Sequence, residues 1–149
     1  MNTRVAKAVD PRQWLLVLSG LLALFFMIRL GHSVQDYDVR SVSAPEARHL
    51  IDSGAVVVDV RGPQAYGERH IPGAISVPLD DLRHAVPASL AHAIAKPVVV
   101  YCGDGVSIGP EGTALLNKAG FRKAMNLEHG IDGWASAGYP VATPGASKG

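Results

Sequence analysis

Cysteine is almost absent from this sequence of 149 residues, in which Cys102 stands alone. A single cysteine excludes an internal disulfide and any zinc or iron–sulfur site that needs several cysteine ligands. His84 and His92 are eight residues apart, too far for one metal site on a helix face, and we predict no metal. The lone thiol is therefore either a small buried hydrophobic group or a reactive nucleophile.

Charged residues are also few, at 18% of the chain, below the roughly 25% usual for soluble domains. This shortage indicates an unusually apolar segment. The net charge of +1 divides unevenly, because four of the basic residues but only one acidic residue lie in residues 1–35. The rest of the chain is slightly acidic, so it has no basic surface for nucleic acid, and we predict no nucleic-acid partner.

The apolar segment runs without a charge from Gln13 to Ile28. A membrane-spanning helix needs about 20 residues, a length reached if the helix continues past Arg29, whose side chain can snorkel to the interface. We predict a short tail over residues 1–12 and a transmembrane anchor over residues 13–34, hence a single-pass protein of the cell membrane. Basic residues on both flanks leave the side of the domain open. A cleaved signal peptide and a buried core helix are the alternatives.

Residues 35–141 alternate short strands with helices. Two β-branched runs, residues 56–60 and 98–101, are typical of strands buried on both faces. Shorter strands are expected at residues 74–77 and 123–127. Helices are expected at residues 43–52, 80–95 with a break near Pro87, 110–119 and 131–137. This alternation predicts one α/β domain with a mainly parallel sheet, followed by a flexible tail at residues 142–149.

Cys102 directly follows the expected strand at residues 98–101, and a glycine-rich loop leads from it to a helix near Pro110. Ligands of parallel α/β sheets bind beyond the carboxyl ends of the strands. Glycines allow the N–H groups of a loop to turn inward as an anion nest, which would make a thiol there more acidic and more reactive. A buried structural cysteine at a strand end is the alternative.

Five stretches match one family in consistent order: residues 57–61 (VVDVR), 68–78 (ERHIPGAISVP), 99–102 (VVYC), 114–121 (ALLNKAGF) and 130–134 (GIDGW). With them, residues 39–141 resemble the rhodanese-like (sulfurtransferase) domain family. The resemblance implies a five-stranded, mainly parallel sheet flanked by helices. It also implies that Cys102 accepts a sulfane sulfur and passes it on, and that Asp59 and Arg61 lie near the active loop.

We therefore predict a membrane-anchored sulfurtransferase of the thiosulfate/thiol type, with Cys102 as the persulfide-carrying nucleophile. Its partners are a small sulfur donor and a thiol or cyanide acceptor. Thiolate attack on sulfur needs no metal or organic cofactor, so none is predicted. The predicted substrate-binding residues are Asp59, Arg61, Gly103, Asp104, Gly105, Val106, Ser107, Ile108 and Gly109.

The loop departs from the family's pattern in its charge. Ser107, or Ile108 if the loop is one residue longer, stands where the family commonly has arginine. Asp104 adds a negative charge beside the thiol, which opposes thiolate formation. Arg61 is a candidate to supply the missing positive charge. These departures favour an alternative function, a catalytically weak rhodanese-like module that acts as a membrane-tethered interaction domain for an unidentified protein.

Overall fold

The computed structural model describes residues 18–19 and 37–143, and the folded domain comprises residues from Tyr37 onward. Of the anchor predicted at residues 13–34, only Leu18 and Ser19 are described, and both are helical. Within the described ranges, no helix has the length and apolar character needed to cross a membrane. The predicted tail at residues 1–12 and most of the one at 142–149 also lie outside the described residues.

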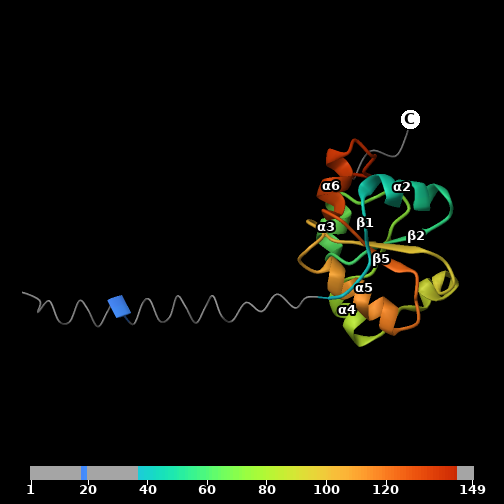
Figure 1. The fold of residues 1–149 in the computed structure, drawn as a ribbon, viewed down its shortest axis with the longest axis horizontal. Helices are drawn as coiled ribbons and strands as arrows, with labels where there is room; N and C mark the ends of the chain where they lie inside the picture. The colour runs from blue at the N-terminus through green and yellow to red at the C-terminus, as the bar shows by residue number, and fades with distance from the viewer. Residues whose placement is uncertain (1–17, 20–36, 144–149) are drawn as a thin grey trace, which may run out of the picture. The chain divides into compact units, whose positions relative to one another are not determined.

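Five strands form one sheet in the order β1-β5-β4-β2-β3 (Figure 1). All of their pairings are parallel, and the sequence predicted a mainly parallel sheet. The central strand, β4, is fully buried, which is what a strand covered on both faces requires. The strands are β1 (Ser41–Val42), β2 (Val56–Asp59), β3 (Ile75–Ser76), β4 (Val98–Tyr101) and β5 (Ala124–Leu127).

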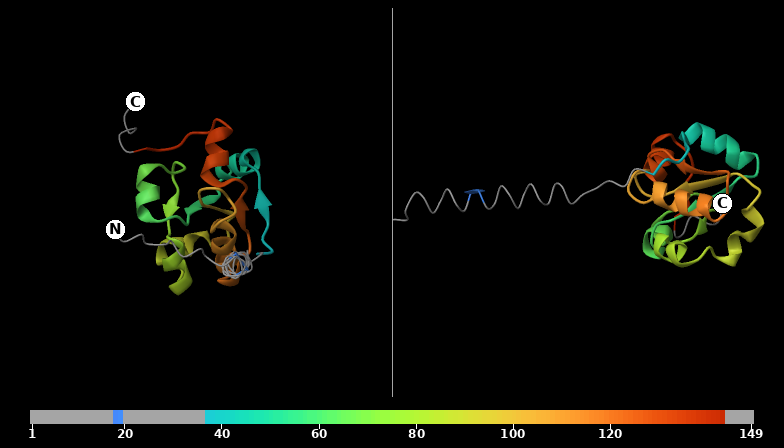
Figure 2. Two further views of the ribbon diagram at one scale, coloured as in Figure 1. Left: turned by 90° about the vertical axis from the view of Figure 1, so that its left-hand side faces the viewer. Right: turned by 60° about the horizontal axis from the view of Figure 1, so that its bottom comes forward.

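Helices cover both faces of the sheet. One face packs against α4 (Leu79–His84), the 3-10 helix η1 (Ala88–Ala93) and α5 (Gly109–Lys118). The other packs against α2 (Ala44–Asp52), α3 (Pro63–Glu68) and α6 (Gly130–Ser136). Figure 1 shows α2 and α6 above the sheet and α4 and α5 below it, and Figure 2 shows that cyan α2 and red α6 lie on one side.

Successive side chains of a strand point to opposite faces, and this alternation divides the core in two. Val58, Val100 and Cys102 belong to the cluster on the α4–α5 face. Val57 and Tyr101 belong to the cluster on the α2–α6 face. A side chain at the edge of the sheet therefore reaches the loops on its own face and not those on the other face.

Several element boundaries follow from local chemistry. Ser43 caps α2 by accepting a hydrogen bond from the Glu46 amide at 3.4 Å, and Gly54 follows the helix with a positive φ of 95°. The helical stretch expected over residues 80–95 is divided into α4 and η1, and Pro87 caps the second piece. β1 and α3 were not predicted from the sequence, because they have two and six residues and are too short to show a periodic pattern.

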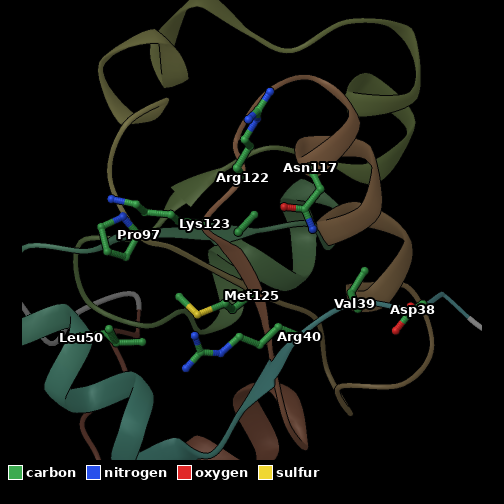
Figure 3. Close-up of a pocket in the computed structure, with 10 residues that line it drawn as sticks. Asp38, Val39, Arg40, Leu50, Pro97, Asn117, Arg122, Lys123 and Met125 are labelled. Atoms are coloured by element: carbon green, nitrogen blue, oxygen red, sulfur yellow. The ribbon is translucent and has the colours of Figure 1, made fainter.

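A pocket of about 490 Å³ opens at the amino-terminal edge of the sheet, where β4 and β5 begin (Figure 3). Cys102 follows the opposite, carboxyl-terminal end of β4, and no residue of its loop lines this pocket. The pocket is lined by Asp38, Val39, Arg40, Leu50, Pro97, Asn117, Arg122, Lys123, Ala124 and Met125. We assign it no part in the chemistry of the thiol.

Candidate active site

Cys102 is the first residue after β4, and its side chain is completely buried in the cluster on the α4–α5 face. Residues 103–108 form the loop that leads from it to α5, which begins at Gly109. The strand places the sulfur at the carboxyl-terminal edge of the sheet, where parallel α/β folds bind their ligands. The predicted placement of the thiol between a buried strand and a helix is thus confirmed.

Three groups of the loop surround the sulfur. The Gly105 N–H donates to Cys102 Sγ at 3.2 Å, and the Cys102 thiol donates to Asp104 Oδ1 at 3.3 Å. Ser107 Oγ lies 3.7 Å from Sγ but only 2.9 Å from Asp104 Oδ1. A hydroxyl has a single proton, and the shorter contact directs it to the carboxylate. The sulfur therefore has one strong donor, the Gly105 amide.

Most of the loop's inward N–H groups bind the Asp104 carboxylate. The amides of Val106 and Ser107 each donate to Asp104 Oδ1 at 3.0 Å. These hydrogen bonds, the Ser107 amide foremost, hold the pKa of the Asp104 carboxyl well below its ordinary value. The sequence analysis expected an anion nest around the sulfur. The structure corrects this in part, because the nest exists but its anion is the chain's own carboxylate.

The loop is fastened to the beginning of α6. The amides of Ile131 and Asp132 donate to the carbonyls of Cys102 and Gly103 at 2.9 and 3.1 Å. Gly105 has a φ of 80°, and a Cβ there would lie 2.3 Å from the His129 amide nitrogen. Only glycine fits such a conformation this close to another backbone. The end of β4, the loop and α6 therefore form one tightly packed corner.

Asn126, which the sequence analysis did not single out, also belongs to this corner. It lies on β5 opposite Val100, is 3% exposed, and donates from Nδ2 to the Gly105 carbonyl at 2.9 Å. Its Oδ1 is the one buried side-chain oxygen or nitrogen of the described residues that lacks a hydrogen-bond partner. An asparagine inside the otherwise apolar strand Ala124–Leu127 was the available signal.

Asp59 and Arg61 lie on the other face of the sheet from the sulfur. Asp59 pairs in register with Tyr101, whose side chain belongs to the α2–α6 cluster. Arg61 binds both carboxylate oxygens of Asp59, with the closest contact at 2.6 Å, and also donates to the Arg69 carbonyl at 2.7 Å. The guanidinium is occupied there, so it does not supply the positive charge that the loop lacks.

The remaining predicted residues differ in what they contact. Val106 is 71% exposed at the outer end of the loop, whereas Ile108 packs against the α4–α5 cluster. A Cβ on Gly109 would lie 2.4 Å from Asn126 Oδ1 and 3.2 Å from Cys102 Sγ. The structure therefore brings Gly103, Asp104, Gly105, Ser107 and Gly109 around the sulfur, and Ile108 packs against the apolar cluster to which Cys102 itself belongs.

The described residues contain no group of three or more His, Cys, Asp or Glu side chains that could hold a metal ion. A thiol in contact with a backbone N–H donor can carry a transferred group through a covalent intermediate.

Comparisons with known proteins agree with this arrangement. The model of the rhodanese-like domain family matches residues 43–137. Thiosulfate sulfurtransferase GlpE of Pseudomonas syringae is 35% identical over 107 residues, which are 71% of this chain and 95% of that protein. The uncharacterized protein YibN of Escherichia coli K12 is 33% identical over 104 residues, 69% of this chain and 72% of that protein.

Solved structures show the same fold. A rhodanese-related protein from Thermoplasma volcanium has a TM-score of 0.60 and 27% identity, covering 69% of this chain and 97% of its own. A thiosulfate sulfurtransferase from Pseudomonas aeruginosa has a TM-score of 0.62 and 34% identity over 70% of this chain and 20% of its own. With its parallel sheet, its strand-end cysteine and these relatives, the chain belongs to the rhodanese-like domain family.

Proposed function

We propose that this protein is a sulfurtransferase in which Cys102 carries the transferred sulfur as a persulfide. The observation that carries the proposal is the Gly105 N–H, which is directed at Sγ from 3.2 Å, at the edge of the sheet where such folds bind ligands. Relatives named thiosulfate sulfurtransferase support the reaction class.

The reaction consists of two nucleophilic steps. The Cys102 thiolate attacks the sulfane sulfur of a donor, the donor's bond to that sulfur breaks, and Cys102 becomes a persulfide. A thiol or cyanide then attacks the outer sulfur and restores the cysteine. The Gly105 N–H is placed to stabilise the negative charge at Sγ in both steps without itself moving a proton.

Access to the sulfur requires that the loop move. Cys102 is completely buried, whereas Asp104, Val106 and Ser107 beside it are exposed. Displacement of these exposed residues would open Sγ to a donor and leave the buried anchor points at Gly105 and α6 in place. We therefore expect the loading of Cys102 to be slower than the reaction of a free thiol with the same donor.

The second candidate function is the catalytically weak module that acts as an interaction domain. The complete burial of the sulfur and the capture of the loop amides by Asp104 favour it. Intact-protein mass spectrometry after incubation with thiosulfate, mercaptopyruvate or a persulfide distinguishes the two. A gain of one sulfur atom that is lost in Cys102→Ser supports the enzyme, and no gain from any donor supports the module.

We also propose that residues 13–34 anchor the domain to the cell membrane, because residues 13–28 are apolar and carry no charge. Fractionation of cells that express the full chain tests this proposal. Retention in the membrane pellet after alkaline extraction supports the anchor, and a soluble protein whose mature N-terminus lies beyond residue 30 indicates a cleaved signal peptide. A reporter fused after Gly149 determines the side of the membrane.

A further inference from the structure

We propose that the Asp104 carboxylate selects the sulfur donor: it admits an uncharged hydropersulfide, R–S–S–H, and disfavours the dianion thiosulfate. The inference rests on the proposed sulfurtransferase function and names the substrate class of the same site. Its basis is that Asp104 occupies the amides on which a donor's negative charge would otherwise bind.

The N–H groups of the loop are already occupied. The amides of Val106 and Ser107 and the Ser107 hydroxyl all donate to one oxygen, Asp104 Oδ1, at 2.9 to 3.0 Å. A nest of N–H groups stabilises one anion by pointing several donors at it. Since a carboxylate already fills this nest, a sulfonate group of a donor has to displace it.

The loop also lacks positive charge. Residues 102–117 contain no lysine or arginine. Arg61 is bound to Asp59 on the opposite face of the sheet, and Arg83, which contacts the first turn of α5, is paired with Glu111 and Asp80. An incoming dianion therefore meets the Asp104 carboxylate without a free cation of the loop to offset the repulsion.

The surroundings of the sulfur also contain hydrogen-bond acceptors. Asp104 Oδ1 accepts the Cys102 S–H at 3.3 Å, and Asn126 Oδ1 is buried without a partner among the described residues. The amide of Asn126 is oriented by its donation to the Gly105 carbonyl, so its oxygen faces Gly109, beside the sulfur. The unpartnered Asn126 Oδ1 suits a donor that itself bears an S–H group.

The chemistry balances with such a donor. The Cys102 thiolate forms a bond to the outer sulfur of R–S–S–H, and the S–S bond of the donor breaks. The leaving R–S⁻ takes the electron pair and the proton that Cys102 gave up, so the products are Cys102–S–S–H and R–S–H. Asp104 does not take this proton, because its hydrogen bonds hold the pKa of its carboxyl very low.

The test compares two donors on the full chain, thiosulfate and the hydropersulfide of N-acetylcysteine methyl ester. The S–S–H group is more acidic than a thiol, so both donors are compared at a pH low enough to keep the hydropersulfide protonated and uncharged. The rate at which Cys102 gains one sulfur is followed by mass spectrometry in a single turnover. Asp104→Asn removes the charge and keeps an oxygen acceptor, Asp104→Ala removes both, and Asp81→Asn on α4 makes the same change outside the loop. Thermal unfolding confirms that each variant is folded.

We expect the wild-type protein to load faster from the hydropersulfide. Because loss of the Asp104 charge also favours the Cys102 thiolate with either donor, the selectivity shows in the ratio of the two rates: Asp104→Asn raises the thiosulfate rate relative to the hydropersulfide rate about tenfold or more, equivalent to about 1.4 kcal/mol. Asp104→Ala gives the highest thiosulfate rate, and Asp81→Asn changes neither rate. Equal changes with both donors, or a wild-type preference for thiosulfate, would overturn the selectivity and leave the proposed function standing.

A second readout does not depend on sulfur transfer. Cys102 is alkylated with neutral iodoacetamide and, separately, with anionic iodoacetate. The rate with iodoacetamide divided by the rate with iodoacetate should fall at least about threefold in Asp104→Asn, because the anionic reagent is no longer repelled. An unchanged ratio contradicts the repulsion by Asp104. If no donor loads Cys102 in the wild-type protein or in any variant, both the proposed function and the donor selectivity are wrong.

Discussion

Two carboxylates at the carboxyl-terminal edge of the sheet, Asp59 and Asp104, are held in opposite ways. Asp59 is completely buried and is bound by the Arg61 guanidinium through both of its oxygens. Asp104 is exposed and is bound by the amides and the hydroxyl of its own loop. One carboxylate has a cation as its partner, and the other has only dipoles.

The difference separates the structural part of this edge from the reactive part. The Asp59–Arg61 pair fixes the segment that contains Arg69, on the face opposite the sulfur. Asp104 lies next to the sulfur, where its charge acts on whatever approaches Cys102. The positive charge of Arg61, which was predicted to bind substrate, therefore contributes to the stability of the fold. The negative charge of Asp104 acts on the reactivity of Cys102.

The largest effect on stability is expected for the Asp59–Arg61 pair. Arg61→Met leaves Asp59 buried without its cation, and breaking a buried ion pair in this way costs about 3–5 kcal/mol. Urea unfolding should show this loss of free energy, and the double variant Asp59→Asn/Arg61→Met should recover part of it. A loss below about 1 kcal/mol would mean that the pair is not structural.

An intermediate effect is expected within the loop. Gly105→Ala places a Cβ 2.3 Å from the His129 amide at a φ of 80°, so we expect a loss of about 1–3 kcal/mol or more and slower loading of Cys102. Gly103→Ala is the matched control, since a Cβ there meets nothing within 4 Å. If Gly103→Ala and Gly105→Ala lose the same amount of stability in thermal unfolding, the loop is not fastened at Gly105.

The smallest effect concerns the pH dependence of stability. The pKa of Asp104 is lowered by folding, so the folded state binds fewer protons than the unfolded state in acid. The stability that Asp104 contributes is complete above its unfolded pKa of about 3.9 and is lost as the pH falls toward the lower pKa of the folded state.

The measurement is the difference in free energy of unfolding between the wild-type protein and Asp104→Asn. It should be constant above about pH 5.5 and should shrink below about pH 4. The pKa of Glu111 is also lowered, by Arg83 foremost, but this group titrates in both proteins and its contribution cancels. A difference that grows in acid would contradict the hydrogen bonding of Asp104.

The fold was predictable where the sequence pattern was long enough. The β-branched runs identified β2 and β4, because the pattern of a buried strand is contained within a few residues. The two-residue strand β1 depends on its pairing with β5, about 85 residues away, and no local pattern encodes that contact.

The residues of the candidate site were predictable from the sequence, but the directions of their side chains and N–H groups were not. The position of Cys102 and the glycines of its loop followed from the strand-to-helix pattern, and the opposing charge of Asp104 followed from its residue type. Which acceptor the amides of Val106 and Ser107 would choose depends on backbone torsions that the sequence does not reveal. Asp59 lies beside Tyr101 in the sheet, but the alternation of strand side chains places it, and the Arg61 guanidinium bound to it, on the other face from the sulfur.

The most direct test of Cys102 as a sulfur carrier is the mass of the intact protein before and after exposure to a hydropersulfide and then to cyanide. We predict a gain of one sulfur atom, its removal by cyanide with release of thiocyanate, and neither change in Cys102→Ser. An unchanged mass with every donor, in a protein whose Cys102 is still alkylated once it is unfolded, would contradict the proposed function.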